Sequence, residues 1–401
     1  MLPARHGAGD NSGRGGRCQL TTKIKTESIL DRYDPLREIL CCPVTKEPLR
    51  LVEIDELLPC LSEAERGRVP EGTIGAFVSN AAGRAYPLTE RVADFLAEDS
   101  LAIRPPPPAT APTSPADAVK RSVKDWYDRF GWRKNERGMY LDSALFSQNR
   151  PVGHGLYEMT SHLSIMDRLA GGDFVLDAAS GAIAHPEYLA YSWFFRSRVC
   201  VDMSTTALME ADAKLRPSDF CCLADICQLP FRDESFDGAV SGYTIQHIPE
   251  SQQGRAVEEL YRVIRPGAHL CILTDVTYTR GHRLLVLALR AMRKLSRVLR
   301  MASPRPDPSA SPRGSREEAP HALYAHVRGL AWWKGVAREL THRCRIESLR
   351  LLNKWEFESL YGGSNRAAKA LHWIEEAFPR WMSGLSAYCV IDICKPASGR
   401  E

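Results

Sequence analysis

The chain has 401 residues, of which 44% are hydrophobic and 25% are charged. This composition excludes a wholly disordered chain and a fibrous repeat, and the length exceeds that of one ordinary domain. Lys and Arg outnumber Asp and Glu by only 53 to 49, so we do not expect nucleic acid as a partner. The longest uninterrupted apolar run, 284–289, is far shorter than the roughly 20 residues of a membrane span.

The N-terminal third divides into three parts. Residues 1–34, rich in Gly and Ser and without the apolar segment of a secretory signal, are predicted to be a flexible tail. Residues 35–100 are predicted to form a small α+β module, and the proline-rich residues 101–117 a linker. Several cysteines lie inside apolar, strand-like runs, where thiols behave as buried hydrophobic groups, which favours a reducing, cytoplasmic setting.

Residues 118–397 alternate short β-rich runs with helical stretches, which is typical of a parallel sheet covered on both faces. Seven strands are predicted, at 174–177, 198–202, 220–225, 238–242, 269–274, 345–351 and 387–394. The expected fold class is therefore α/β, with a doubly wound, mostly parallel, seven-stranded sheet. Residues 302–320, rich in Pro, Ser and charge, are predicted to be a mobile insert.

Three acids, Asp177, Asp202 and Asp225, stand at the ends of the first three predicted strands. In an open α/β sheet, ligands bind outside the carboxyl ends of the strands. A carboxylate can accept both hydrogens of a ribose diol, which suits Asp202, and Asp225 beside Ile226 could meet an adenine ring. The alternative for any one of these acids is that it caps the following helix.

Four blocks in this part of the chain resemble the class I S-adenosylmethionine-dependent methyltransferases, a group that includes ubiquinone and menaquinone biosynthesis enzymes. The blocks are VLDAASG at 175–181, VDMS at 201–204, ADI at 224–226 and LYRVIRPG at 260–267. The resemblance implies S-adenosylmethionine as cofactor. It assigns Asp177, Ala179 and Gly181 to the methionine part, Asp202 and Met203 to the ribose, and Asp225 and Ile226 to the adenine.

The glycine loop departs from the family pattern. Ala179 and Ile183 occupy the two outer glycine positions, so that Gly181 alone remains. Because a β-branched residue disfavours positive φ, we expect that Ile183 does not adopt the usual loop conformation and that residues 184–188 reshape the loop.

The N-terminal module resembles the small zinc-ribbon-like domain of tRNA methyltransferase activators, through residues 39–45, 83–88 and 92–96. Only Cys42 keeps a ligand position, while Thr45, Ser79 and Ala82 stand at the other three. A structural zinc site needs four N or S ligands, so we expect no metal and a degenerate scaffold that docks on the catalytic domain.

Tyr243 and His247, after the fourth predicted strand, are the candidate catalytic residues, since this fold brings side chains there toward the transferred methyl group. Histidine is the usual general base near neutral pH. The alternative for His247 is a helix-start residue bonded to backbone, and His185 is a weaker candidate. The aromatic segment 126–132 fits either a lid over the pocket or ordinary core between helices.

Residues 280–300 form a basic amphipathic helix, which could contact an anionic membrane or simply cover the pocket. The predicted function is methyl transfer to a small-molecule or lipid-like acceptor, with oxygen preferred over nitrogen and carbon as the acceptor atom. The alternatives are an RNA or protein methyltransferase and a non-catalytic cofactor-binding scaffold.

Overall fold

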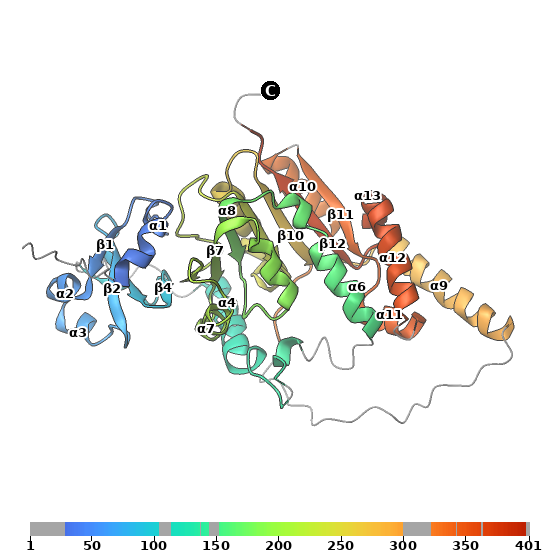
Figure 1. The fold of residues 1–401 in the computed structure, drawn as a ribbon, viewed down its shortest axis with the longest axis horizontal. Coiled ribbons are helices and arrows are strands. Elements are labelled where there is room, and N and C mark those ends of the chain that lie inside the picture. Colours follow the sequence, from blue (N-terminus) through green and yellow to red (C-terminus); the bar gives the residue numbers. More distant parts are fainter. Residues whose placement is uncertain are drawn as a thin grey trace, which may run out of the picture.

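A computed structural model describes residues 29–103, 114–136, 138–143, 152–299, 322–341, 343–361 and 364–397. Their strands join in one twelve-stranded sheet with the order β1-β2-β3-β4-β8-β7-β6-β9-β10-β12-β11, and β5 pairs with β3 (Figure 1). Most of the predicted tail, the prolines at 105–108 and the predicted insert at 302–320 lie outside the described residues.

The predicted α/β class and the mostly parallel sheet are confirmed. The seven strands of the C-terminal part are β6 (Gly172–Ala178), β7 (Phe195–Asp202), β8 (Phe220–Leu223), β9 (Gly238–Gly242), β10 (His269–Asp275), β11 (Cys344–Arg350) and β12 (Tyr388–Cys394). β6 to β10 run parallel, whereas β12, which lies between β10 and β11, runs antiparallel to both. The strand order reverses at β6, which lies between β7 and β9, and such a reversal opens a crevice at the carboxyl ends of the strands.

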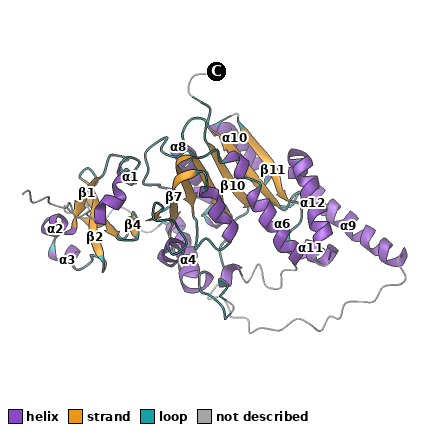
Figure 2. Ribbon diagram, viewed as in Figure 1, coloured by secondary structure: helices purple, strands orange, loops and turns teal. Residues whose placement is uncertain are grey.

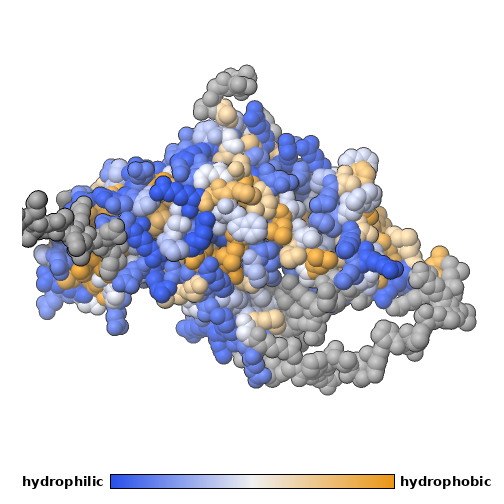
Figure 3. All heavy atoms as spheres, in the orientation of Figure 1, coloured by the Kyte–Doolittle hydropathy of each residue, from blue (hydrophilic) through white to orange (hydrophobic). Residues whose placement is uncertain are grey.

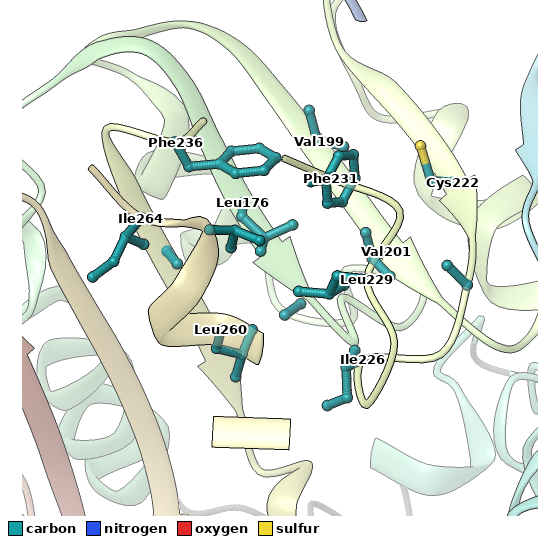
Figure 4. Packing of buried hydrophobic residues seen from close by; sticks show 14 of the residues in the cluster. Leu176, Val199, Val201, Cys222, Ile226, Leu229, Phe231, Phe236, Leu260 and Ile264 are labelled. Carbon is teal, nitrogen blue, oxygen red and sulfur yellow. The ribbon is translucent and has the colours of Figure 1, made fainter. Parts of the chain in front are cut away.

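Helices cover both faces of this sheet (Figure 2). Successive strand residues alternate between the faces, so that Leu176 packs in one core cluster and Val175 in another. On the first face lie α8 (Gln253–Val263) and α10 (Leu330–Leu340). Figure 4 shows Leu260 of α8 in the same cluster as Leu176, with Val199 and Val201 of β7 on the right of the view. The opposite side carries α6 (Val152–Leu163), η5 (Pro186–Ser192), α7 (Thr205–Asp212) and α12 (Asn365–Ala377).

The N-terminal module continues the same sheet. Its elements are η1 (Ile29–Tyr33), α1 (Asp34–Arg37), β1 (Arg50–Glu53), α2 (Ile54–Leu57), η2 (Leu58–Cys60), α3 (Glu63–Arg66), β2 (Thr73–Ser79), β3 (Arg84–Thr89), β4 (Val92–Asp94) and β5 (Leu101–Ala102). β4 pairs in parallel with β8, Val92 opposite Cys221, and the Tyr33 and Phe220 rings lie 6.0 Å apart. Two elements, η1 and β5, fall inside the ranges that the sequence predicts to be tail and linker.

Cys42, the one predicted ligand position that keeps a cysteine, is buried in the N-terminal module. Its Sγ lies 3.4 Å from the Tyr86 hydroxyl. Burial opposes ionisation of this thiol, but hydrogen bonds from Ser79, Thr45 and Tyr86 lower its pKa. In the part of the chain that the structure describes, no group of three or more His, Cys, Asp or Glu could hold a metal ion.

The helix α9 (Arg280–Leu299) extends from one end of the molecule, beside α11 (Lys354–Tyr361) (Figure 1). It also contacts η8 (Ser383–Leu385), which follows α13 (Pro379–Met382). Val286 anchors its first half in a cluster with Leu352 and Phe357. On the outer side Leu284, Leu287, Met292 and Leu295 are 66%, 59%, 57% and 60% exposed. Figure 3 shows hydrophobic and hydrophilic side chains next to one another over this end. No described helix is long and apolar enough to cross a membrane.

Candidate functional site

A cavity of about 220 Å³ lies at the carboxyl ends of β6, β7, β8 and β9, under α4 (Pro115–Trp126). The structure brings together there most of the residues that the sequence analysis singled out, namely Ala179, Gly181, Asp202, Met203, Asp225, Ile226, Tyr243 and His247. His185 also lines it. Asp177 does not.

The loop after β6 has the left-handed backbone conformation at all three positions where the family pattern has glycine. Ala179, Gly181 and Ile183 have φ values of 56°, 56° and 50°. The expectation that Ile183 avoids positive φ was therefore wrong. A left-handed residue costs about 1–2 kcal/mol, and the burial of Ile183 against Cys200 and Leu208 offsets that cost.

The side chain of Lys214, which follows α7 in the chain, holds this loop. Lys214 Nζ donates to the carbonyl oxygen of Ile183 at 3.0 Å and to that of Ala182. The backbone N–H of Ile183 also donates to Ser180 O, at 3.3 Å. Side-chain and backbone contacts thus hold the loop at a position where the family pattern described above has glycine.

Asp202 receives two backbone hydrogen bonds at the end of β7. The N–H of Gly181 donates to its Oδ2 at 2.9 Å, and the N–H of Ser204 donates to its Oδ1 at 2.8 Å. Burial raises the pKa of Asp202 to about 6. Each carboxylate oxygen keeps a second lone pair, so Asp202 can still accept hydrogens from a bound diol.

Aromatic rings close the cavity over Gly181. A Cβ at Gly181 would lie 2.5 Å from Trp132 Cη2, so only glycine fits under that ring. Trp132 stacks on Tyr127 with ring centroids 5.1 Å apart, and both line the cavity. Trp126 and Phe130 pack instead in a cluster with Leu141, so the aromatic segment provides both cavity wall and core.

Asp225 and Ile226 form the edge of the cavity after β8. The N–H of Cys227 donates to Asp225 Oδ1 at 2.8 Å, and Lys120 of α4 forms an ion pair with Oδ2. Ile226 is buried in the core cluster of Figure 4 and presents part of its side chain to the cavity. Sequence reasoning missed Lys120, since one lysine in a polar helix carries no distinguishing pattern.

Asp177 is held behind the cavity by Arg198 of β7. Arg198 Nε donates to Asp177 Oδ2 at 3.0 Å, and its Nη1 donates to Tyr188 O at 2.7 Å. Arg198 is 1% exposed, so the ion pair is buried. Asp177 also lines a smaller cavity of about 30 Å³ together with Ala179 and Ser180, and its assignment to the methionine part stays a prediction.

His247 presents an unprotonated nitrogen. Its Nδ1 lies 2.8 Å from the carbonyl oxygen of Tyr324. A carbonyl only accepts, so Nδ1 carries the proton and Nε2 is left with its lone pair. Burial lowers the pKa of His247 and keeps the ring neutral. Its backbone N–H also donates to Thr244 O at 2.8 Å, as expected for a residue in the short helix η6 (Ile245–His247).

The Tyr243 hydroxyl belongs to a buried polar chain. It accepts from Arg350 Nη2 at 2.9 Å and lies 3.1 Å from His162 Nε2. His162 Nδ1 lies 3.0 Å from Glu187 Oε1. Sequence reasoning missed His162, Glu187 and Arg350, which come from α6, η5 and β11 and meet only in the folded chain.

Comparison with known proteins agrees with this arrangement. The family described as "Methyltransferase domain" matches residues 176–272. A demethylmenaquinone methyltransferase of Mycobacterium tuberculosis is 30% identical over 176 residues, which are 43% of this chain and 72% of that protein. Methyltransferase GfsG of Streptomyces halstedii is 28% identical over 182 residues, 41% of this chain and 62% of that protein.

Two solved structures are similar to parts of this chain at low identity. One is a chain of the complex that contains the Haloferax volcanii Trm112 methyltransferase activator, with 13% identity, a TM-score of 0.41, and coverage of 70% of this chain and 100% of that one. The other is phosphoethanolamine N-methyltransferase 2 of Haemonchus contortus, with 17% identity, a TM-score of 0.39, and coverage of 68% and 60%.

Proposed function

Because the chain belongs to the S-adenosylmethionine-dependent methyltransferase family, we propose that it methylates a hydroxyl group of a small-molecule or lipid-like acceptor. The observation that carries this proposal is His247, which lines the same cavity as Gly181 and Asp202 and whose Nδ1 bond to Tyr324 O leaves Nε2 with its lone pair. A neutral amine or a thiolate is nucleophilic as it stands, whereas a hydroxyl is a weak nucleophile until a base takes up its proton.

The residues of the cavity fit the cofactor. Asp202 has free lone pairs for the ribose hydroxyls, Met203 lies beside it, and Ile226 offers an apolar surface for the adenine ring. Gly181 and Ala179 bring backbone close to the methionine part. When bound, S-adenosylmethionine supplies an electrophilic methyl group on sulfur. The chain's part is to orient the acceptor, exclude water and take up the acceptor proton at His247 Nε2.

The test has two stages. Binding of S-adenosylmethionine is measured by calorimetry, and incorporation of its labelled methyl group is then followed into matched phenols, alcohols and amines. Methylation of hydroxyl acceptors in preference to amines supports the proposal. Binding without any methyl transfer would favour the scaffold alternative. The argument for that alternative was the loss of two glycines, and it is weakened because Ala179 and Ile183 keep the left-handed loop conformation.

Membrane contact is a further part of the proposal and predicts binding to anionic vesicles. On α9, Arg283, Arg290 and Lys294 are exposed beside the exposed leucines, as in helices that lie on anionic lipid. Each cation near such a surface contributes about 1 kcal/mol. We expect replacement of these three by Gln to reduce co-sedimentation with phosphatidylserine vesicles by tenfold or more, with unchanged affinity for S-adenosylmethionine. Equal sedimentation of variant and wild type would contradict membrane contact.

An RNA substrate has one observation in its favour. Lys334, Arg338, Arg343, Arg345 and Arg380 line an open groove of about 890 Å³ beside the edge strand β11. Among the described residues, no Phe, Tyr or Trp lines this groove, although stacking on aromatic rings is a main contribution to single-stranded RNA binding. The small-molecule proposal is therefore preferred.

The N-terminal module is proposed to be a metal-free, zinc-ribbon-like scaffold. Thr45, Ser79 and Tyr86 surround the Cys42 thiol with hydrogen-bonding groups, which replace the ligands that a zinc ion needs. Purified protein should therefore contain far less than one zinc per chain by elemental analysis, before and after chelator treatment. Stoichiometric zinc whose removal lowers the melting temperature would contradict this assignment.

A further inference from the structure

The sheet ends at β11, and the outer edge of this strand has no partner strand within the described residues. β11 is last in the strand order and pairs only with β12. The N–H of Cys394 donates to Arg343 O at 3.0 Å, so in the antiparallel pattern Arg343 and Arg345 turn their backbone groups toward β12. The N–H and C=O groups of Cys344 and Ile346 therefore point outward, and no backbone group of another described residue bonds to them.

Two helices flank this edge, one on each face of the sheet. Ile346 and Leu340 of α10 pack against the same core cluster. Arg345 points to the opposite face, because successive residues of a strand alternate. On that face Arg380 Nε of α13 lies 3.6 Å from Glu347 Oε1 of β11. The open groove of about 890 Å³ thus runs along β11 between α10 and α13 (Figure 1).

The groove carries a surplus of positive charge. Its exposed cations are Lys334 and Arg338 of α10, Arg343 and Arg345 at the edge strand, and Arg380 of α13. Asp392, the one acid among the described lining residues, is buried, with His269 Nδ1 2.7 Å from its Oδ1 and Arg168 Nε 3.5 Å from its Oδ2. Apart from Arg380, these cations have no ion pair or side-chain hydrogen bond to a described residue, so their charge is available to a partner.

An extended acidic peptide fits both the open edge and the charge. Its main chain can pair with the outward groups of Cys344 and Ile346, while its side chains alternate between the two faces. Acidic side chains meet Lys334 and Arg338 on one face and Arg345 on the other. An RNA strand matches the charge but has no N–H and C=O groups to pair with β11. Pairing with β11 of a second copy would bring like cations together, which is unfavourable.

We propose that the groove beside β11 binds an acidic segment of a partner protein, which adds to the sheet as a further strand. The groove shares no lining residue with the cavity at the ends of β6 to β9. The partner therefore docks away from the cofactor and acceptor residues, and the proposal holds whichever acceptor the chain methylates.

The experiment measures binding of labelled probes to the full chain by fluorescence anisotropy. The main probe is an octapeptide of alternating Glu and Val. The comparison probes are the same peptide with every backbone nitrogen methylated, an octapeptide of alternating Lys and Val, and a single-stranded RNA octamer. We expect the methylated peptide, which keeps its charges but has no main-chain donors, and the lysine peptide to bind about tenfold or more weakly than the main probe.

Two double variants test the cations. Arg338→Gln/Arg345→Gln removes one cation from each face of the groove and should weaken the main probe about tenfold, the effect of two ion pairs. Arg366→Gln/Lys369→Gln removes two exposed cations of α12 that do not line the groove, and should bind like wild type. Thermal melts report whether both variants are folded.

The other outcomes overturn the proposal in different ways. Equal binding of the methylated peptide means that charge alone acts and that no strand is added. Tighter binding of the RNA octamer, lost in Arg338→Gln/Arg345→Gln, assigns the groove to nucleic acid. If no probe binds, the groove is not a docking site. Aggregation of the variant would then show that the cations only protect the edge strand from self-association.

Discussion

Replacement of His247 by Asn is expected to lower methyl transfer to a hydroxyl acceptor by about 100-fold or more, the usual contribution of a positioned general base. An asparagine can still donate a hydrogen bond toward the carbonyl of Tyr324, but it has no basic nitrogen at the place of Nε2. Affinity for S-adenosylmethionine should stay within twofold. Initial rates with labelled cofactor, together with calorimetry, measure the two effects separately.

The dependence on pH provides a second readout of His247. Because burial lowers its pKa below the ordinary value of about 6.5, the basic form prevails at neutral pH, and turnover should fall only in the acid range. The Asn variant should lose this acid limb. His372→Asn, a change at a histidine on α12 paired with Glu376, is the matched control and should keep it. Wild-type turnover in the Asn variant would show that positioning alone suffices.

Replacement of Asp202 by Ala is expected to weaken S-adenosylmethionine about tenfold or more. Each hydrogen bond lost to a buried partner costs roughly 1–3 kcal/mol, and 1.4 kcal/mol corresponds to a factor of ten. The variant also removes the acceptor of the Gly181 and Ser204 N–H groups, so the loop after β6 is affected with it. Calorimetry gives the affinity, and a thermal melt reports whether the variant is folded.

A control variant and a pH dependence test the role of the Asp202 carboxylate in ligand binding. Asp173→Ala removes an exposed acid at the start of β6 and should bind like wild type. Since burial raises the pKa of Asp202 to about 6, affinity in the wild type should fall as the pH drops through that value, and this dependence should be absent in Asp202→Ala. Unchanged affinity in a folded Asp202→Ala protein would remove this residue from the site.

Local patterns in the sequence determined the strands and the places of the site residues. Apolar runs such as Val199–Val201, each ending in an acid, predicted β6, β7 and β8 and the edge of the sheet at which Asp202 and Asp225 lie. This was possible because a strand buried on both faces needs a continuous apolar run, and because parallel strands bring their carboxyl ends to one edge.

Predictions from local conformational preference failed where contacts between residues distant in sequence stabilise the observed structure. Steric preference alone predicts that Ile183 avoids positive φ, yet burial in the cluster with Leu208 and a hydrogen bond from Lys214 hold it there. In the same way, β4 (Val92–Asp94) joins the sheet of the C-terminal part because it pairs with β8. The two strands lie more than 100 residues apart in the chain, and composition does not encode the register of their pairing.

Only the tertiary structure decided the protonation and the partners of the charged groups. Arg198 in the sequence is one cation in an apolar run, and its pairing with Asp177 follows from the register of β6 and β7. The protonated nitrogen of His247 is selected by a carbonyl 77 residues away. Burial and charge pairing depend on all the neighbours of a group in space, and a linear pattern contains only those along the chain.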